Sequence, residues 1–240
     1  ITEAKYQLTH GTYIARKDIY LTEWIEEWLG DYVKTHRKIG TYTTYTDLYH
    51  SAIRPEVTLL RLQDITVDTV EQIYKRIKKN RKYSQSSMET IAVIMKGCLE
   101  RAEGRHLITT NPAKTAELPI LVDYRAEEEE QRIALTREQQ DLFMECAQDS
   151  YLYNLFYVLL RTGIRVGEAL ALKYTDIDKK NNQLHIRRTL KHIEGQFVED
   201  TPKSKTSIRD IPLTDNLIKV LDVQRNYWGF KIDRIDRYLF

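Results

Sequence analysis

The stretch "RTGIRVGEALAL", residues 161–172, places two charged side chains at the junction of two apolar runs. The run before it, residues 152–160, repeats leucine and phenylalanine at helical spacing. Gly163 interrupts that pattern, and a second apolar run follows it. We therefore predict two buried helices joined at Gly163, with Arg165 in the first turn of the second helix and Glu168 three residues further on.

Arg165 and Glu168 have the chemistry of an anion site. A helix N-terminus presents unpaired N–H groups, and an arginine there adds a planar fork that fits two oxygens of a phosphate. Glu168, one turn on, can hold the guanidinium in one orientation. Gly167 and Ala169 are small and would let a bulky backbone approach. A purely structural ion pair explains the same two residues, so this motif alone leaves both readings open.

A second motif, "TPKSKTSIRDIPL", covers residues 201–213. Lys203 and Lys205 stand near the end of one expected strand, and Arg209 lies in the next strand. In a strand, positions 203 and 205 face the same side, so spacing does not separate the two lysines. An exposed hairpin with solubilising lysines would give the same pattern.

Around these motifs the sequence predicts a mainly α fold with a small antiparallel β-sheet. Four amphipathic helices are expected in residues 19–118, two of their starts being a Thr22 cap and a capping box from Ser86 to Glu89. The later part begins with a capping box from Thr136 to Gln139. Alternating runs in residues 181–213 then predict three antiparallel strands, with turn signals at Asn181-Asn182 and Gly195, before Thr214 caps a last helix.

Charge suggests how the chain is divided. Residues 1–118 carry 18 Lys and Arg against 15 Asp and Glu, and residues 132–240 carry 18 against 15 again. Residues 119–131, with Pro119 and four consecutive glutamates, hold one arginine against five acids and are expected to be an acidic linker. The pattern fits ordinary surface charge, or two nucleic-acid-facing modules joined by a linker that avoids the polyanion.

Several classes of site are not expected. Cys98 and Cys146 form no CxxC and fall on apolar helix faces, which favours core thiols in a reducing compartment over a disulfide. The six histidines show no metal-ligand spacing, so we predict neither a metal nor another cofactor. We expect no membrane span and no secretory signal, because no apolar run approaches about 18 residues.

Together, "TGIRVGEALALKYTDID" and "TPKSKTSIRDIPL" resemble the tyrosine recombinases, in particular the phage and conjugative-transposon integrases. In that family the first block carries a catalytic arginine and the second a catalytic lysine. The resemblance implies that Arg165 is catalytic, that Glu168 orients it, and that Lys203 is the general acid, with Lys205 as the alternative. It covers nearly the whole chain and implies strand cleavage by a tyrosine, without metal or nucleotide.

The resemblance also implies a domain plan. Residues 1–18 would be the remnant of an arm-binding region, residues 19–118 a helical core-binding domain ending near Asn111-Pro112-Ala113, and residues 132–240 the first part of an α+β catalytic domain. The family continues beyond the hairpin with an H-x-x-R block and the tyrosine nucleophile, which we expect this chain to lack. Neither Tyr227 nor Tyr238 has the context of that nucleophile.

The implied partner is double-stranded DNA at attachment or core sites, in the bacterial cytoplasm. Self-association is expected in the synaptic complex of the full-length protein. The predicted DNA-binding residues are Tyr42, Thr43, Lys75, Arg76, Lys78, Lys79, Lys82 and Arg209. A solvated helix face is the competing explanation for each lysine. For the chain as a whole, the alternatives are a non-catalytic, truncated integrase that competes with or regulates recombination, and an unrelated helical scaffold without affinity for DNA.

Overall fold

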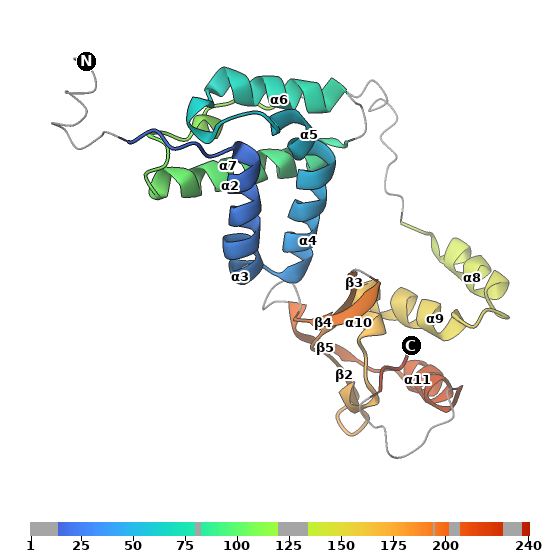
Figure 1. Cartoon of the computed structure of the whole chain (residues 1–240). Helices are drawn as coiled ribbons and strands as arrows, with labels where there is room; N and C mark the ends of the chain where they lie inside the picture. The colour runs from blue at the N-terminus through green and yellow to red at the C-terminus, as the bar shows by residue number, and fades with distance from the viewer. Residues whose placement is uncertain (1–13, 80–82, 120–133, 194, 202–206, 228–236) are drawn as a thin grey trace. The chain divides into compact units, whose positions relative to one another are not determined.

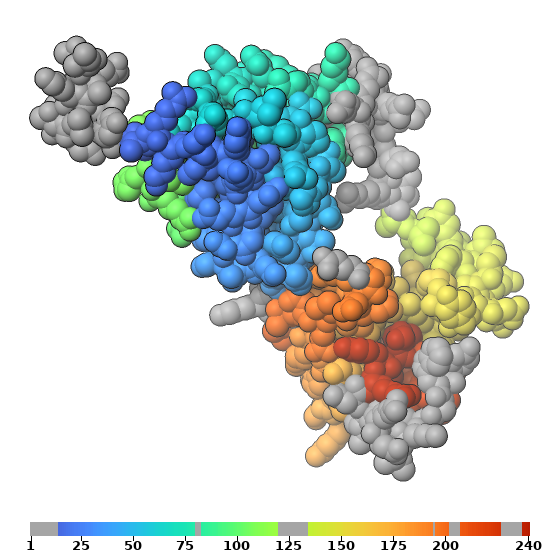
Figure 2. Space-filling view, viewed as in Figure 1, coloured from blue at the N-terminus to red at the C-terminus, as the bar shows by residue number. Residues whose placement is uncertain are grey.

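The computed structural model describes residues 14–79, 83–119, 134–193, 195–201, 207–227 and 237–240, which are coloured in Figures 1 and 2. The chain forms two compact units, Ile1–Glu129 and Glu130–Phe240. Each unit has its own hydrophobic core. The division falls in the acidic segment, most of which lies outside the described residues.

Two long helices form a hairpin in the first unit (Figure 1). Each contains a wider π-helical turn in its middle, a feature that lets a helix change its packing face without breaking. The first comprises α2 (Leu21–Glu27), η1 (Trp28–Val33) and α3 (Lys34–His36). The second comprises α4 (Ile39–Leu48), η2 (Tyr49–Ile53) and α5 (Arg54–Val57).

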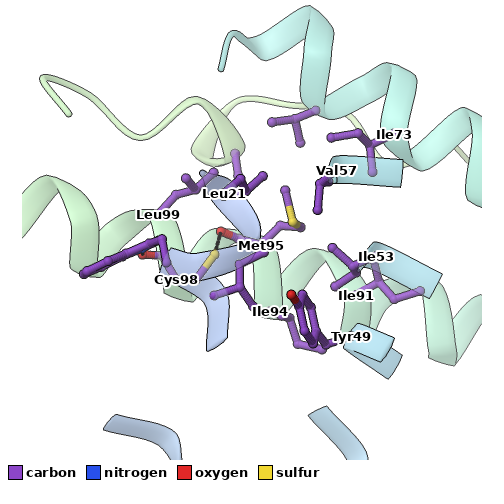
Figure 3. Close-up of a cluster of buried hydrophobic side chains, with 14 of the residues drawn as sticks. Leu21, Tyr49, Ile53, Val57, Ile73, Ile91, Ile94, Met95, Cys98 and Leu99 are labelled. Carbon is purple, nitrogen blue, oxygen red and sulfur yellow. Dashed lines mark hydrogen bonds between the residues drawn. The ribbon is translucent and has the colours of Figure 1, made fainter. Parts of the chain in front are cut away.

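The rest of the first unit packs on this hairpin. Its elements are η3 (Leu62–Asp64), α6 (Val67–Lys79), α7 (Gln85–Gly104) and η4 (Pro112–Lys114). Figure 3 shows Met95 and Cys98 of α7 among the apolar side chains that converge from α2, η2, α5 and α6. The Trp24 indole N–H donates to the Cys98 carbonyl at 2.8 Å, which satisfies the polar atom of a buried ring. The predicted apolar faces of these helices are therefore confirmed as core.

Two of the predicted helix starts are wrong by two residues. Tyr20, not Thr22, precedes the first helix, and the Glu23 carboxylate accepts its N–H at 3.0 Å. Ser84, not Ser86, caps α7, where its hydroxyl accepts the Ser87 N–H at 3.2 Å. Several capping residues in a row allow more than one start, and packing selects among them. At α2, for example, the first helical N–H donates across the unit to the Leu60 carbonyl at 2.8 Å.

In its described residues, the second unit is built from short helices and five short strands. The helices are α8 (Arg137–Cys146), α9 (Tyr153–Thr162), α10 (Val166–Leu170), η5 (Tyr174–Asp176) and α11 (Asp215–Tyr227). The predicted caps are confirmed. Thr136 and Gln139 exchange hydrogen bonds of 2.9 and 3.3 Å, and the Leu217 N–H donates to the Thr214 hydroxyl at 3.3 Å.

The strands form two antiparallel sheets instead of the single three-stranded sheet that was predicted. One sheet has the order β1-β2-β5, and the other is the hairpin β3-β4. The strands are β1 (Ile177–Asp178), β2 (Gln183–Ile186), β3 (Thr189–Ile193), β4 (Gln196–Asp200) and β5 (Arg209–Pro212). The break comes between β2 and β3 at Arg188, whose guanidinium turns inward to the Asp176 carboxylate at 2.6 and 3.1 Å. The predicted turns are confirmed by the positive φ of Asn182 and Gly195.

The last described residues lie against the rest of the second unit. The Leu239 N–H donates to the Leu172 carbonyl at 2.8 Å, and the Leu239 carbonyl accepts from the Gln224 amide at 2.8 Å. Tyr238 also forms an isolated antiparallel bridge with Lys173. In Figure 2 these residues, in red, lie beside the orange residues of the same unit, and the Tyr238 hydroxyl donates to Glu199 of β4 at 2.7 Å.

The cysteines differ from each other. Cys98 is buried, and burial raises the pKa of its thiol above the ordinary range. Cys146 is exposed, so its predicted place in a core is wrong; α8 contributes no fully buried side chain. Among the described residues no helix is long and apolar enough to cross a membrane, and no cluster of three potential metal ligands occurs.

Candidate active site

The junction predicted from the sequence is present between α9 and α10. Gly163 ends α9 with a φ of 64°, and its N–H donates to the Leu159 carbonyl at 2.9 Å. This left-handed conformation favours glycine and is typical of a residue just past a helix end. Arg165 then stands in extended conformation immediately before α10, one position earlier than the predicted first turn.

Glu168 is the centre of the site. It is 3% exposed, yet its carboxylate accepts three hydrogen bonds. Oε1 accepts from Arg165 Nη1 at 2.9 Å, while Oε2 accepts from the Arg165 main-chain N–H at 3.1 Å and from Arg209 Nη2 at 2.9 Å. Burial would raise the pKa of Glu168, but the hydrogen bonds from Arg209 and Arg165 outweigh it and hold that pKa below its usual 4.5.

The two partners of the Arg165–Glu168 pair differ in exposure. The Arg165 side chain is 69% exposed, whereas the Glu168 side chain is 2% exposed. A buried, ionised carboxylate therefore fixes one edge of a guanidinium that otherwise faces solvent. An arginine held in this way can present its remaining N–H groups to an anion without first being ordered.

Arg209 belongs to this site. It was predicted from the sequence as a DNA contact, but Nη2 donates to Glu168 and Nη1 donates to the Ser207 carbonyl at 3.0 Å. The alternation of β5 contained the signal for this: Arg209 and Ile211 are half-buried, and Asp210 between them is exposed. Sharing a face with Ile211 turns Arg209 toward the interior, where Glu168 is the available anion.

Gly167 has a different role from the one expected. A Cβ at this position would lie 2.6 Å from the Thr189 hydroxyl oxygen and 2.7 Å from the Leu190 carbonyl oxygen. The backbone that approaches closely is therefore that of β3 in the same unit. Ala169 is fully buried in the core, so both small residues serve the internal packing of α10.

The two lysines proposed as the general acid, Lys203 and Lys205, lie outside the described residues. Lys82 does as well. Their assignments remain predictions.

The other proposed DNA contacts are in the first unit, and most already have partners. Tyr42 packs partly buried against the core, and the Thr43 hydroxyl donates to the Ile39 carbonyl at 3.1 Å. In α6, Lys75 lies 3.8 Å from Glu71 and Arg76 lies 2.7 Å from Glu56. Lys78 is half-buried and Lys79 is exposed. A phosphate contact requires a positive charge that is accessible to solvent. Lys75, Arg76 and Lys79 are exposed and meet this requirement.

Two family models match this chain. The model of the phage integrase family matches residues 131–240, and the model of the phage integrase N-terminal SAM-like domain matches residues 20–78. The chain belongs to the tyrosine recombinases of the phage integrase family. The matched ranges fall in the two units separately, and the family resemblance read from the two motifs is confirmed.

Curated relatives give the same result. The chain is 24% identical over 229 residues to a XerC-like tyrosine recombinase of Caldanaerobacter subterraneus, covering 91% of this chain and 58% of the relative. It is 42% identical over 76 residues to the ICEBs1 integrase of Bacillus subtilis, covering 31% of this chain and 21% of that integrase. The chain thus spans less than two thirds of the length of these relatives.

Solved integrase structures share the fold. A Tn1549 transposon integrase in complex with circular intermediate DNA matches with a TM-score of 0.75 and 19% identity, covering 92% of this chain and 71% of that one. A lambda integrase dimer bound to a core site matches with a TM-score of 0.60 and 18% identity, covering 94% and 58%. The predicted fold class, helical with small antiparallel sheets, is confirmed.

Proposed function

We propose that this recombinase chain binds double-stranded DNA and supplies part of the active site for site-specific integration of a mobile genetic element. The observation that carries the proposal is the exposed Arg165 held by the buried Glu168. Support also comes from relatives named as integrases and from structural neighbours described in complex with DNA.

In the proposed reaction a tyrosine oxygen bonds to the scissile phosphorus, and the bond from phosphorus to the 5′-oxygen breaks. Arg165 binds the non-bridging oxygens, where negative charge builds. Glu168 orients Arg165. Lys203, or alternatively Lys205, gives its proton to the departing 5′-oxygen. The phosphotyrosyl link retains the energy needed to rejoin the strand, so neither metal nor nucleotide is required.

Tyr238 is a poor choice for the nucleophile. Its hydroxyl donates to Glu199, and this hydrogen bond, followed by burial, raises the pKa of Tyr238. A tyrosine that attacks phosphate needs the opposite shift. We therefore do not propose Tyr238 as the nucleophile, which the family pattern places beyond the H-x-x-R block.

DNA binding is proposed for both units. Residues 19–118 would act as the core-binding domain, with the exposed cations of α6 contacting phosphates, and residues 119–131 would be the linker. Most contacts would go to the phosphate backbone and set position. Self-association in a synaptic complex, and a place in the cytoplasm with the DNA, belong to the same proposal; dimeric and tetrameric assemblies are described for lambda integrase.

The alternative function belongs to another class, a DNA-binding protein that does not cleave its site. A chain without a nucleophile would occupy DNA sites and act as a competitor or regulator of recombination. This candidate and the first make the same prediction about binding. They differ in whether a full-length protein with these residues cleaves DNA.

The test first measures the binding of the 240-residue chain to labelled duplex DNA. Fluorescence anisotropy gives the affinity across a series of salt concentrations. We expect affinity to fall steeply with salt, because phosphate contacts release counterions. We also expect no protein–DNA adduct on a nicked duplex after denaturing electrophoresis. Absence of binding at low salt would refute the proposed DNA binding by this chain, and a covalent adduct would show that a tyrosine of this chain is the nucleophile.

A further inference from the structure

Arg209 joins the strand β5 to the Arg165–Glu168 pair. Its main chain is fixed by the sheet, where Arg209 pairs with Ile186 of β2. Its Nη1 is fixed by the Ser207 carbonyl and its Nη2 by Glu168 Oε2. The side chain is 32% exposed, less than half the 69% of Arg165. Arg209 is therefore oriented inward at both terminal nitrogens.

We propose that Arg209 is a positioning residue, which acts through Glu168 to hold the Arg165 guanidinium in the orientation that receives a DNA phosphate. The inference rests on the proposed function, since it assigns Arg209 to the same phosphate site.

The first reason is geometric. The terminal torsion of a glutamate is broad, so each further hydrogen-bond donor narrows the range over which the carboxylate plane can turn. Arg209 holds Oε2 at 2.9 Å, which directs Oε1 to Arg165 Nη1 at 2.9 Å. Because the Arg165 main-chain N–H also donates to Oε2, at 3.1 Å, the carboxylate is held at both oxygens by its own helix start and by Arg209, which is 41 residues from Glu168 in the sequence.

The second reason is charge. Arg165 and Glu168 alone would form a neutral pair, with little attraction for a further anion. Arg209 adds a second cation to the same buried carboxylate, so the three side chains together carry one net positive charge. That positive charge is presented at the exposed member, Arg165. Arg209 thereby contributes to phosphate attraction without contacting the phosphate.

The first experiment measures the contact on the 240-residue chain. The carboxyl carbon of Glu168 is followed by NMR during a pH titration in the unsubstituted chain and in Arg209→Gln. Loss of Arg209 is expected to raise the pKa of Glu168, and Arg209→Lys, which keeps a cation, should raise it less. Lys179→Gln is the matched control. Lys179 pairs with Asp222 at 2.7 Å, so this substitution removes one positive charge from an ion pair elsewhere in the unit.

The second experiment measures the role. The assay uses a full-length protein that contains these residues and measures single-turnover cleavage of a nicked duplex. The unsubstituted protein is compared with Arg165→Ala, with Arg209→Gln and with the double variant. Arg209→Gln should slow cleavage by roughly tenfold, the size expected for losing a hydrogen bond to a charged group. If Arg209 acts only through Arg165, the double variant should be no slower than Arg165→Ala. Arg209→Lys should recover part of the rate.

The outcomes separate the possible errors. A double variant roughly tenfold slower than Arg165→Ala would mean that Arg209 acts independently, as a direct DNA contact, and would overturn the inference. An unchanged Glu168 titration in a folded Arg209→Gln chain would overturn it as well. If the unsubstituted full-length protein does not cleave, the proposed function fails together with the positioning role of Arg209, while the titration still decides whether the three-residue contact exists.

Discussion

Gly167 of α10 lies so close to Leu190 of β3 that a Cβ on the glycine would stand 2.7 Å from the Leu190 carbonyl oxygen. The same Cβ would stand 2.6 Å from the Thr189 hydroxyl oxygen. Real Cβ atoms do not approach other atoms this closely, so only glycine allows α10 to rest on β3. Because α10 also contains Glu168 and follows directly on Arg165, this packing contact sets the position of the candidate active site.

We predict that Gly167→Ala destabilises the second unit by about 1–3 kcal/mol, the usual cost of overpacking, because one of the atoms it meets is main chain and cannot rotate away. Urea unfolding gives the free energy. Gly30→Ala is the control: a Cβ there meets nothing within 4 Å, and the helix should gain about 0.5–1 kcal/mol. Equal stability of Gly167→Ala and the unsubstituted chain would contradict the packing described.

Glu168 should make stability depend on pH. Its pKa is below the usual 4.5 in the folded chain, so its ionised form stabilises the fold above that value. This stabilisation is lost as the pH falls through the folded pKa. We therefore expect Glu168→Gln to be less stable at pH 7, and its difference from the unsubstituted chain to shrink below about pH 4.5.

The measurement for Glu168 is the free energy of unfolding of both chains between pH 7 and pH 3, by denaturant titration. Glu145→Gln provides the comparison, since it removes an exposed carboxylate of α8. Its difference from the unsubstituted chain should stay small throughout. A constant difference for Glu168→Gln across this pH range would mean that the carboxylate charge does not contribute.

Arg165→Ala, in a full-length protein with these residues, should leave DNA affinity within a few-fold and slow cleavage by about 10²–10³. Affinity comes from many phosphate contacts, whereas Arg165 would stabilise charge at one phosphate in the transition state. Duplex binding by anisotropy and single-turnover cleavage are measured on the same preparation. Near-normal cleavage by Arg165→Ala would refute the phosphate-binding role.

The sequence predicted most of the first unit because its helices have strong apolar periodicity. Val70, Ile73, Tyr74 and Ile77, for example, recur at helical spacing and are all buried. The helix starts were less predictable. In "SQSS" more than one serine can cap, so the local sequence does not distinguish Ser84, which caps α7 in the structure, from Ser86.

The candidate site was predicted in part for a similar reason. Arg165 and Glu168 are three residues apart, so their hydrogen bonds follow from helix geometry. Arg209 is 41 residues away from Glu168 in the sequence, and its contact depends on how β5 pairs with β2 and brings Arg209 to Glu168 of α10. A long-range contact of this kind is a tertiary property. The two-sheet arrangement likewise differs from the prediction, because strand pairing is a tertiary property, as is the Arg188–Asp176 contact between β2 and β3.

The last prediction concerns which lysine, Lys203 or Lys205, protonates the 5′-oxygen. In the strand that the sequence predicts, positions 203 and 205 would face the same side, and the family resemblance favours Lys203, which follows Thr201-Pro202. A substrate with sulfur in place of the 5′-bridging oxygen has a leaving group that needs little protonation. Lys203→Ala should therefore cleave the normal substrate poorly and recover on the sulfur substrate, whereas Lys205→Ala should show little defect on either. Recovery by Lys205→Ala instead would reverse the assignment, and recovery by neither variant would place the general acid outside this hairpin.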